Sequence, residues 1–144
     1  MAVNVGQRNV PDTPANRQLD ALQKAQDLAL HTIKITANQN IFRPEYQNAL
    51  TNDIIRCAKD IYIHAGSAND IRVDGNKERL LERLKLQRTA IRECGDMLRL
   101  IDLARRLFRL KGNKVRYWSG LTRETAGLLT RWHESDLKRY RDAG

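Results

Sequence analysis

Nine basic residues in the second half of the chain have the side chains best suited to chemistry, and the chemistry they suit is phosphate binding. Arginine grips a phosphate through two parallel hydrogen bonds and stacks on bases, and lysine contributes a compact charge. At about 100° per residue around a helix, the first six fall on one side and flank the apolar series. The last three extend this row through the loop that follows. The nine residues are Lys85, Arg88, Arg92, Arg99, Arg106, Arg109, Lys111, Lys114 and Arg116.

The charge is distributed very unevenly along the chain. Residues 1–71 hold seven Lys or Arg and seven Asp or Glu, whereas residues 72–144 hold nineteen and ten, so the net charge of +9 belongs to the second half. Eighteen of the 26 basic residues are arginines. An Arg-rich helical surface on a small chain indicates nucleic acid as the first candidate partner.

The alternative interpretation of the basic row is a solvated helix face whose charges pair with residues four positions away. The balance of charge argues against it, because residues 99–116 contain seven cations and one anion, Asp102. Pairing cannot neutralise that excess. Self-repulsion would destabilise such a surface unless an anionic partner or counterions offset it.

Two aromatic residues follow the basic row. Tyr117 and Trp118 offer rings on which an unpaired base or an arginine can stack. Trp118 and Trp132 are two helical heptads apart, and aromatics in such positions are more often anchors of a core or an interface. The core interpretation is therefore favoured for both tryptophans.

Catalytic chemistry has little support in the sequence. His31, His64 and His133 fall on three different predicted helices, and no metal-binding, nucleophile or phosphate-loop motif is present. Residues 133–136 (His-Glu-Ser-Asp) include a base, a nucleophile and an acid, but consecutive helical residues point in different directions, so we interpret them as a polar helix surface. No enzyme activity, metal or cofactor is expected, although an unrecognised site in a nuclease or another enzyme stays as a minor alternative.

Length and cysteine content set the outer limits. A chain of 144 residues makes one domain with a single core. Cys57 and Cys94 fall at apolar helical positions, so we expect reduced core thiols, with a bridge between neighbouring helices as the alternative. The sequence has no leader and no long apolar run, which favours a cytoplasmic protein.

Four amphipathic segments follow a polar lead-in. Residues 1–12 are turn-rich and expected to be mobile, and residues 13–144 form the predicted domain. In the first segment Leu19, Leu22, Ala29, Ile33 and Thr36 recur at helical spacings. Short loops between such segments favour an all-α, up-down-up-down four-helix bundle. Helices are predicted at about 13–38, 44–65 and 77–110, with a turn at 113–119 before the last.

Self-association is predicted from the third segment. Four apolar residues, Met97, Leu100, Ala104 and Leu107, fall outside its main apolar seam and would be partly exposed in a single bundle. We therefore assign them to an oligomer interface. Arg105 falls on the apolar arc, where we expect it to line an oligomer interior or to pair with Asp60 or Glu124.

Several short runs resemble one known family. They are Phe42-Arg43-Pro44-Glu45-Tyr46, Leu50-Thr51 through Ile61, His64-Ala65-Gly66-Ser67-Ala68-Asn69 and Trp132-His133-Glu134-Ser135-Asp136. They are similar to the accessory variability determinants of diversity-generating retroelements, and to the related bundle proteins encoded within ribosomal RNA intervening sequences. The similarity covers residues 18–140, through short motifs that helix and cap preferences partly dictate.

The resemblance implies a basic bacterial or phage-encoded bundle that forms a ring, with a pentamer expected. Such a bundle binds a reverse transcriptase and its template RNA during mutagenic retrohoming, and the partner carries the polymerase chemistry. DNA or an RNA–DNA hybrid is a further possible ligand, and no membrane is expected as a partner. Two alternatives stay open: a structural bundle that binds an acidic protein, and a ribosomal RNA intervening-sequence protein.

Overall fold

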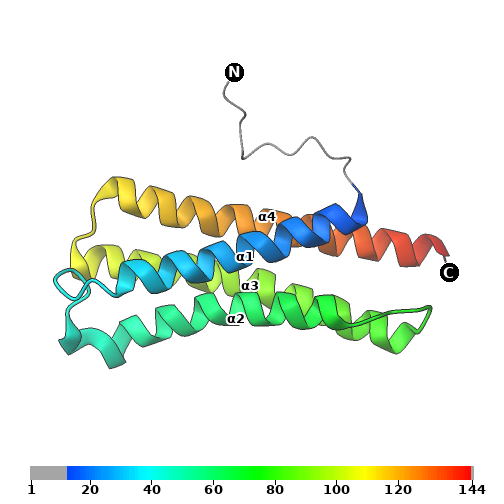
Figure 1. Ribbon diagram of the computed structural model, residues 1–144, viewed down its shortest axis with the longest axis horizontal. Coiled ribbons are helices and arrows are strands. Elements are labelled where there is room, and N and C mark those ends of the chain that lie inside the picture. The colour runs from blue at the N-terminus through cyan, green and yellow to red at the C-terminus, as the bar shows by residue number, and fades with distance from the viewer. Residues whose placement is uncertain (1–12, 144) are drawn as a thin grey trace, which may run out of the picture.

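Residues 13–143 are described by a computed structural model, and this part of the chain is all-helical, with four long helices and no strand. The helices are α1 (Pro14–Thr36), α2 (Asn52–Asp70), α3 (Lys77–Phe108) and α4 (Gly112–Ala143). They run alternately up and down, and each contacts the next, with α4 closing against α1 (Figure 1). The predicted bundle is confirmed in this respect. The lead-in 1–12, expected to be mobile, lies outside the described residues.

Local signals explain where the helices begin. Thr13 accepts a hydrogen bond from the backbone N–H of Asn16 at 3.2 Å, and Pro14 occupies the first turn, as predicted for the start of α1. Asn76 caps α3 in the same way through the N–H of Arg79. The turn before it uses Asp74 and Gly75 at positive φ.

The predicted end of the second helix is wrong. The helical segment opens at Pro44 as expected, with a 3₁₀ turn, η1 (Pro44–Tyr46), and a π turn, η2 (Gln47–Thr51), but α2 continues through Gly66 to Asp70 instead of ending near residue 65. Gly66 does not end the helix, because Ala65 and Ala68 on either side are fully buried and hold the backbone in place.

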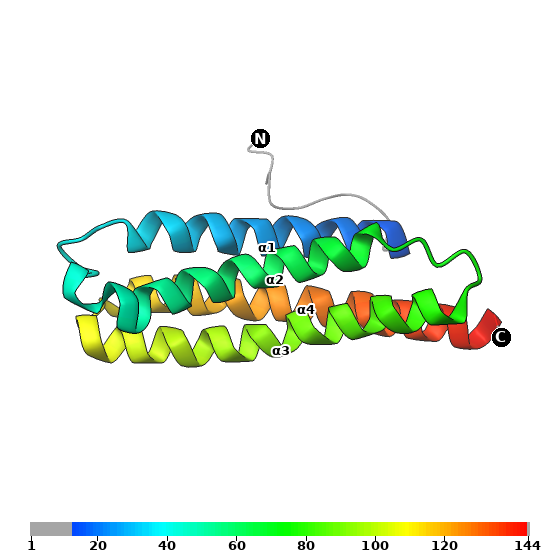
Figure 2. The same cartoon turned by 90° about the horizontal axis from the view of Figure 1, so that it is seen from below.

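The turn expected at 113–119 is also wrong, since α4 already begins at Gly112 and only residues 109–111 connect it to α3. The buried side chain of Trp118 holds this first part of α4 against the core. The connection is therefore tight, and it lies at the same end of the bundle as the connection between α1 and α2 (Figures 1 and 2).

The core combines small and large residues on facing helices, with both tryptophans on α4. Fully buried alanines on α1 and α2 leave room for Trp118 and Trp132 of α4, neither of which is exposed. Close packing of this kind needs complementary volumes on facing helices. The exposed Leu19 and Ile33 are exceptions to the predicted apolar face of α1, whose core side is built instead from Ala21, Ala25, Leu28, Ala29, Thr32 and Thr36.

Candidate nucleic-acid interface

Five of the nine predicted phosphate-binding residues lie along the outer side of α3 and are exposed. We call them the basic stripe: Lys85, Arg88, Arg92, Arg99 and Arg106. At about 100° per residue they share one arc of the helix. Two leucines, Leu81 and Leu103, are also exposed within this arc, a feature that the sequence reasoning did not single out.

The other four residues surround the connection between α3 and α4, and we call them the basic turn: Arg109, Lys111, Lys114 and Arg116. All four are exposed. Arg109 ends α3 in the left-handed conformation, with φ of 53°, and its N–H bonds the carbonyl of Arg105. The guanidinium of Arg116 lies back beside Gly112, 3.2 Å from the position that a Cβ would occupy there.

The basic turn coincides with the N-terminus of a long helix. The first turn of α4 contains no acidic residue, and Lys111 and Lys114 stand at it. A helix N-terminus carries a partial positive charge and favours anions, and acidic side chains are the usual occupants. Side-chain and backbone charges of the same sign therefore meet at the start of α4, whereas Arg106 and Arg109 stand at the C-terminus of α3, whose dipole is negative.

The cations of this region are only partly paired. Arg99 lies 3.6 Å from Asp96, and Arg105 lies 3.0 Å from Asp102. Within residues 13–143 the remaining five cations between 99 and 116 have no acidic side chain within ion-pair distance. The surplus of positive charge inferred from composition is therefore not neutralised by acidic side chains elsewhere in the described part of the fold. The five are Arg106, Arg109, Lys111, Lys114 and Arg116.

The pairing expected for Arg105 is wrong, and its place in an oligomer interior stays a prediction. Its side chain is half exposed and pairs with Asp102 on its own helix, not with Asp60 or Glu124. Glu124 instead lies 3.3 Å from Lys24 of α1. An exposed Arg105 adds to the positive charge of the surface beside the basic stripe.

The two aromatic candidates differ in exposure. The ring of Tyr117 is 62 % exposed and meets the ring of His31 edge-on, with centroids 4.8 Å apart. Trp118 is fully buried, and its Nε1 donates to Oγ1 of Thr32 at 3.0 Å. Stacking of a base is therefore open to Tyr117 and closed to Trp118, and the core interpretation of Trp118 and Trp132 is confirmed.

Two of the four residues assigned to an oligomer interface are misplaced. Met97 and Ala104 have no exposed surface and belong to the core, and Leu100 and Leu107 are half buried and pack against it. The seam of α3 is wider than the predicted repeat, because this helix contacts both α2 and α4. Met97 and Ala104 therefore cannot form an oligomer interface, and Leu100 and Leu107 keep only part of their surface exposed.

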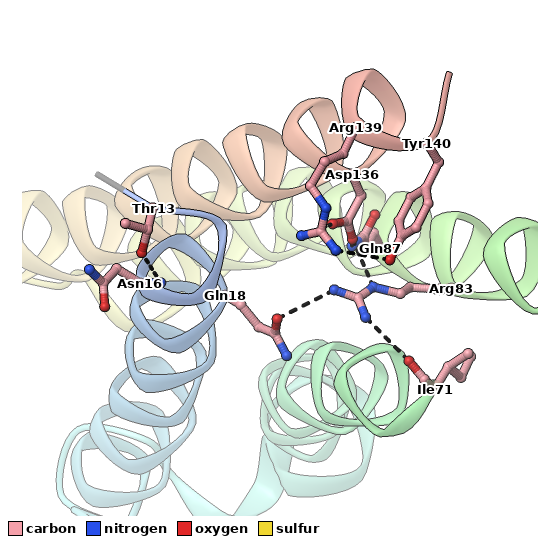
Figure 3. A network of polar contacts seen from close by, with 9 residues as sticks. All are labelled: Thr13, Asn16, Gln18, Ile71, Arg83, Gln87, Asp136, Arg139 and Tyr140. Carbon is pink, nitrogen blue, oxygen red and sulfur yellow. Dashed lines mark hydrogen bonds and ion pairs between the residues drawn. The ribbon is translucent and has the colours of Figure 1, made fainter. Parts of the chain in front are cut away.

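One polar network inside the bundle was not predicted. Arg83 and Asp136 are buried at the end of the bundle away from the basic turn, and Gln87, Gln18 and the carbonyl of Ile71 make further hydrogen bonds to them (Figure 3). Among the described residues, Oδ1 of Asp136 has no hydrogen-bond partner. Asp136 is thus not part of a polar helix surface. The pattern of α4 could have shown this, because residues 118, 122, 125, 129, 132 and 136 share one face.

A histidine, a glutamate and a cysteine also meet between α2 and α3. Nδ1 of His64 lies 2.6 Å from Oε1 of Glu93, and the thiol of Cys57 donates to the backbone carbonyl of Glu93 at 3.4 Å. Burial, reinforced by Glu93, Asp96 and Asp60, raises the pKa of Cys57 to about 12. A thiol held in its protonated form is not an activated nucleophile.

Within the described part of the chain, no three His, Cys, Asp or Glu side chains gather closely enough to hold a metal ion. Both cysteines are free thiols, as expected, and Cys94 is buried. None of the helices in residues 13–143 is long and apolar enough to cross a membrane.

The fold and this surface together define a class: a four-helix bundle with a concentrated, partly unpaired basic end. Comparisons of the chain with protein-family models, with curated proteins and with solved structures found no match.

Proposed function

We propose that this chain is a non-catalytic nucleic-acid-binding accessory protein whose basic turn and basic stripe hold a phosphate backbone. The observation that carries the proposal is the set of five unpaired cations around the connection between α3 and α4, of which Lys111 and Lys114 stand at the N-terminus of α4, where the helix dipole adds positive charge. Such a surface gains stability when an anionic polymer occupies it.

The chemistry of the surface favours positioning over sequence reading. Arginine and lysine contacts to phosphates fix the register of a strand and carry no base information. The exposed ring of Tyr117 stands next to Arg116 in the chain, where it can stack one unpaired base of any type. We therefore propose single-stranded or irregular RNA as the ligand, in preference to a specific duplex sequence.

The partner in this proposal is a reverse transcriptase with its template RNA, as in the mutagenic retrohoming of diversity-generating retroelements. This part rests on the resemblance of the runs at 42–46, 50–61, 64–69 and 132–136. The accessory role assigns the polymerase chemistry to the partner and the grip on the template to this chain.

A second candidate function is a structural bundle that binds an acidic protein. The exposed Leu81 and Leu103 within the basic stripe favour it, since protein interfaces combine apolar contacts with charge and phosphate backbones do not need them. A ribosomal RNA intervening-sequence protein is the related alternative within the same fold.

The test is a binding titration with single-stranded RNA and with polyglutamate at several salt concentrations. Each phosphate contact contributes about 0.7 to 0.9 to the log–log salt slope, so about six contacts predict a slope of roughly 4 to 5. Removing three contacts lowers the slope by about 2 to 3. The test variant combines Arg106→Gln, Lys111→Gln and Arg116→Gln.

The matched control removes three exposed cations elsewhere. It combines Arg56→Gln, Arg72→Gln and Lys77→Gln, which lie on α2, in the connection to α3 and at the start of α3. The proposal requires the control to keep most of the RNA affinity and the salt slope. Equal losses of RNA affinity in both triple variants would show that binding depends on the total charge of the chain and not on the basic turn. Tighter binding of polyglutamate than of RNA would favour the acidic protein partner.

The accessory role has its own test. Adding the chain to the reverse transcriptase and template should permit or redirect initiation of cDNA, and the test triple variant should fail to do so while keeping its helical circular dichroism. Normal cDNA synthesis without the chain would reject this role even if RNA binding is real.

A further inference from the structure

One long face of α1 carries no charged residue. It runs from the first turn of the helix to its C-terminal cap, and at about 100° per residue its members share an arc of roughly 80°. The charged residues of α1 fall outside this arc. Three of its apolar residues are strongly exposed: Leu19 at 54 %, Leu30 at 48 % and Ile33 at 43 %. The face consists of Ala15, Leu19, Leu22, Gln26, Leu30, Ile33 and Ala37.

The spacing along this face is symmetric. Counted outward from Gln26, residues of matching type stand at four, seven and eleven positions on either side. Two such helices packed antiparallel about a two-fold axis at Gln26 would place Leu22 against Leu30 of the partner subunit and Leu19 against Ile33 of the partner subunit. Ala15 would then meet Ala37 of the partner subunit. A self-complementary patch of this kind is what a two-fold interface requires.

A groove beside the face gives a second helix room to seat. It lies between α1 and α2, which run side by side (Figure 2), and has a volume of about 590 Å³. Leu19, Leu22 and Gln26 line it from α1, and Ile63, which is 52 % exposed, lines it from α2. Gly66 keeps the α2 side open, because no other residue approaches the position of a Cβ there.

The size and charge of the α1 face and the adjoining groove fit a second copy of the chain. A 23-residue helix is about 35 Å long, and the α1 face together with the groove and the α2 side that lines it, which includes Asp70, forms a strip about two helices wide. Such a strip covers roughly 700 Å² on each partner, near the lower limit of specific interfaces. A chain with a net charge of +9 repels its copies, so an uncharged face is where two copies can approach most closely.

We propose that α1 is a homodimer interface in which two copies pair antiparallel about a two-fold axis at Gln26. The pairing closes with two copies and so replaces the ring of five that the resemblance implied. It does not depend on nucleic-acid binding, because α3, which carries the basic stripe, contacts α2 and α4 and lies diagonally across the bundle from α1.

The first experiment measures the mass of the full chain in solution by sedimentation from low to high micromolar concentration. The expected species is a dimer of about 33 kDa in equilibrium with the 16.6 kDa monomer. Leu30→Lys should weaken the dimer at least tenfold, because the added charge faces Leu22 of the partner subunit. The matched control is Leu81→Lys, an equally exposed leucine of α3, which should leave the dimer unchanged.

A second experiment tests the register. Gln26→Cys should form a disulfide between copies under mild oxidation, because position 26 meets itself across the axis. Ala15→Cys alone should not, and neither should Ala37→Cys alone, but a mixture of these two variants should crosslink. A monomer at all concentrations, a mass of five chains, a dimer indifferent to Leu30→Lys, or crosslinking of Ala15→Cys by itself would each overturn the proposal.

Discussion

Nε of Arg83 donates to Oδ2 of Asp136 at 2.7 Å, and both side chains are almost completely buried. The pair joins α3 to α4 across 53 residues of sequence. Gln87 donates to the same carboxylate oxygen at 2.8 Å, and the guanidinium lies over the ring of Trp132, 5.3 Å from its centroid. These contacts offset much of the cost of burying two charges, and Nη1 of Arg139 lies 4.0 Å from Oδ1 of Asp136, which accepts no hydrogen bond from the described residues.

Removing the acid should therefore leave an uncompensated buried cation. We expect Asp136→Ala to lower the free energy of unfolding by about 3 to 5 kcal/mol, measured by urea denaturation. Replacing both partners, with Arg83→Met and Asp136→Leu, should recover most of that loss, since an apolar pair of similar volume needs no charge compensation.

The matched control for Asp136→Ala is Asp102→Ala, which removes the acid of an exposed pair with Arg105. Exposed pairs contribute about 0 to 1 kcal/mol. If both substitutions lower the free energy of unfolding by the same amount, the buried pair does not stabilise the bundle as its geometry indicates.

The fold was largely predictable from the sequence, because the helical spacing of apolar residues decides which face of each helix is buried in the bundle. Thr13, Pro14 and Asn76 mark helix starts through local hydrogen bonds that depend only on nearby residues. Gly66 misled the prediction of a helix end, because tertiary packing of the neighbouring alanines overrides the weak intrinsic preference of one glycine.

The candidate site was predictable in its charge and not in its details. Exposure of the basic residues was expected because they fall outside the apolar series of the same helix. Which cations remain unpaired depends on rotamers and on neighbouring helices, as the pair of Arg105 with Asp102 on one helix and the pair of Lys24 with Glu124 between two helices illustrate. Met97 and Ala104 were misplaced because one helix pattern cannot show that two neighbouring helices cover α3 from different sides.

The left-handed residue that ends α3 links stability to binding. Arg109 has φ of 53°, a conformation that costs a residue with a Cβ about 1 kcal/mol or more and that glycine adopts freely. Arg109→Gly should raise the free energy of unfolding by about 0.5 to 1 kcal/mol. It should also weaken RNA binding and reduce the salt slope by about one contact.

Asp74→Gly provides the control for this pair of effects. Asp74 has φ of 46° in the connection between α2 and α3, at the opposite end of the bundle. It should give a similar gain in stability without loss of RNA affinity. Loss of RNA binding in both variants, or in neither, would show that the side chain of Arg109 is not one of the phosphate contacts.

The two thiols should be unreactive in the folded protein. Burial raises the pKa of both Cys57 and Cys94 to about 12, so at pH 8 only about one molecule in 10⁴ carries a given thiolate. Alkylation by iodoacetamide, followed by mass spectrometry, should be very slow under native conditions and rapid in denaturant. Fast labelling of Cys57 under native conditions would show that α2 and α3 separate readily around this thiol.

Acid should destabilise the bundle through two histidines. Burial lowers the pKa of His31 below its ordinary value of 6.5, with a contribution from Lys34. Burial also lowers the pKa of His133, helped by Arg88 and opposed by Asp136 and Glu134. Between each lowered pKa and 6.5 the unfolded chain binds more protons than the folded chain, so the free energy of unfolding rises with pH in this window.

The histidine contribution to stability is therefore complete above about pH 6.5 and is lost as the pH falls below it. Urea denaturation at pH 7.5 and at pH 5.5 should show this loss, and the double variant His31→Gln, His133→Gln should lose less relative to its own value at pH 7.5. Burial raises the pKa of Glu93, which acts in the opposite direction, because stability then falls as the pH rises above the ordinary carboxyl value. That carboxyl is present in both proteins and cancels in the comparison. An identical loss in the double variant would assign the acid sensitivity to groups other than these histidines.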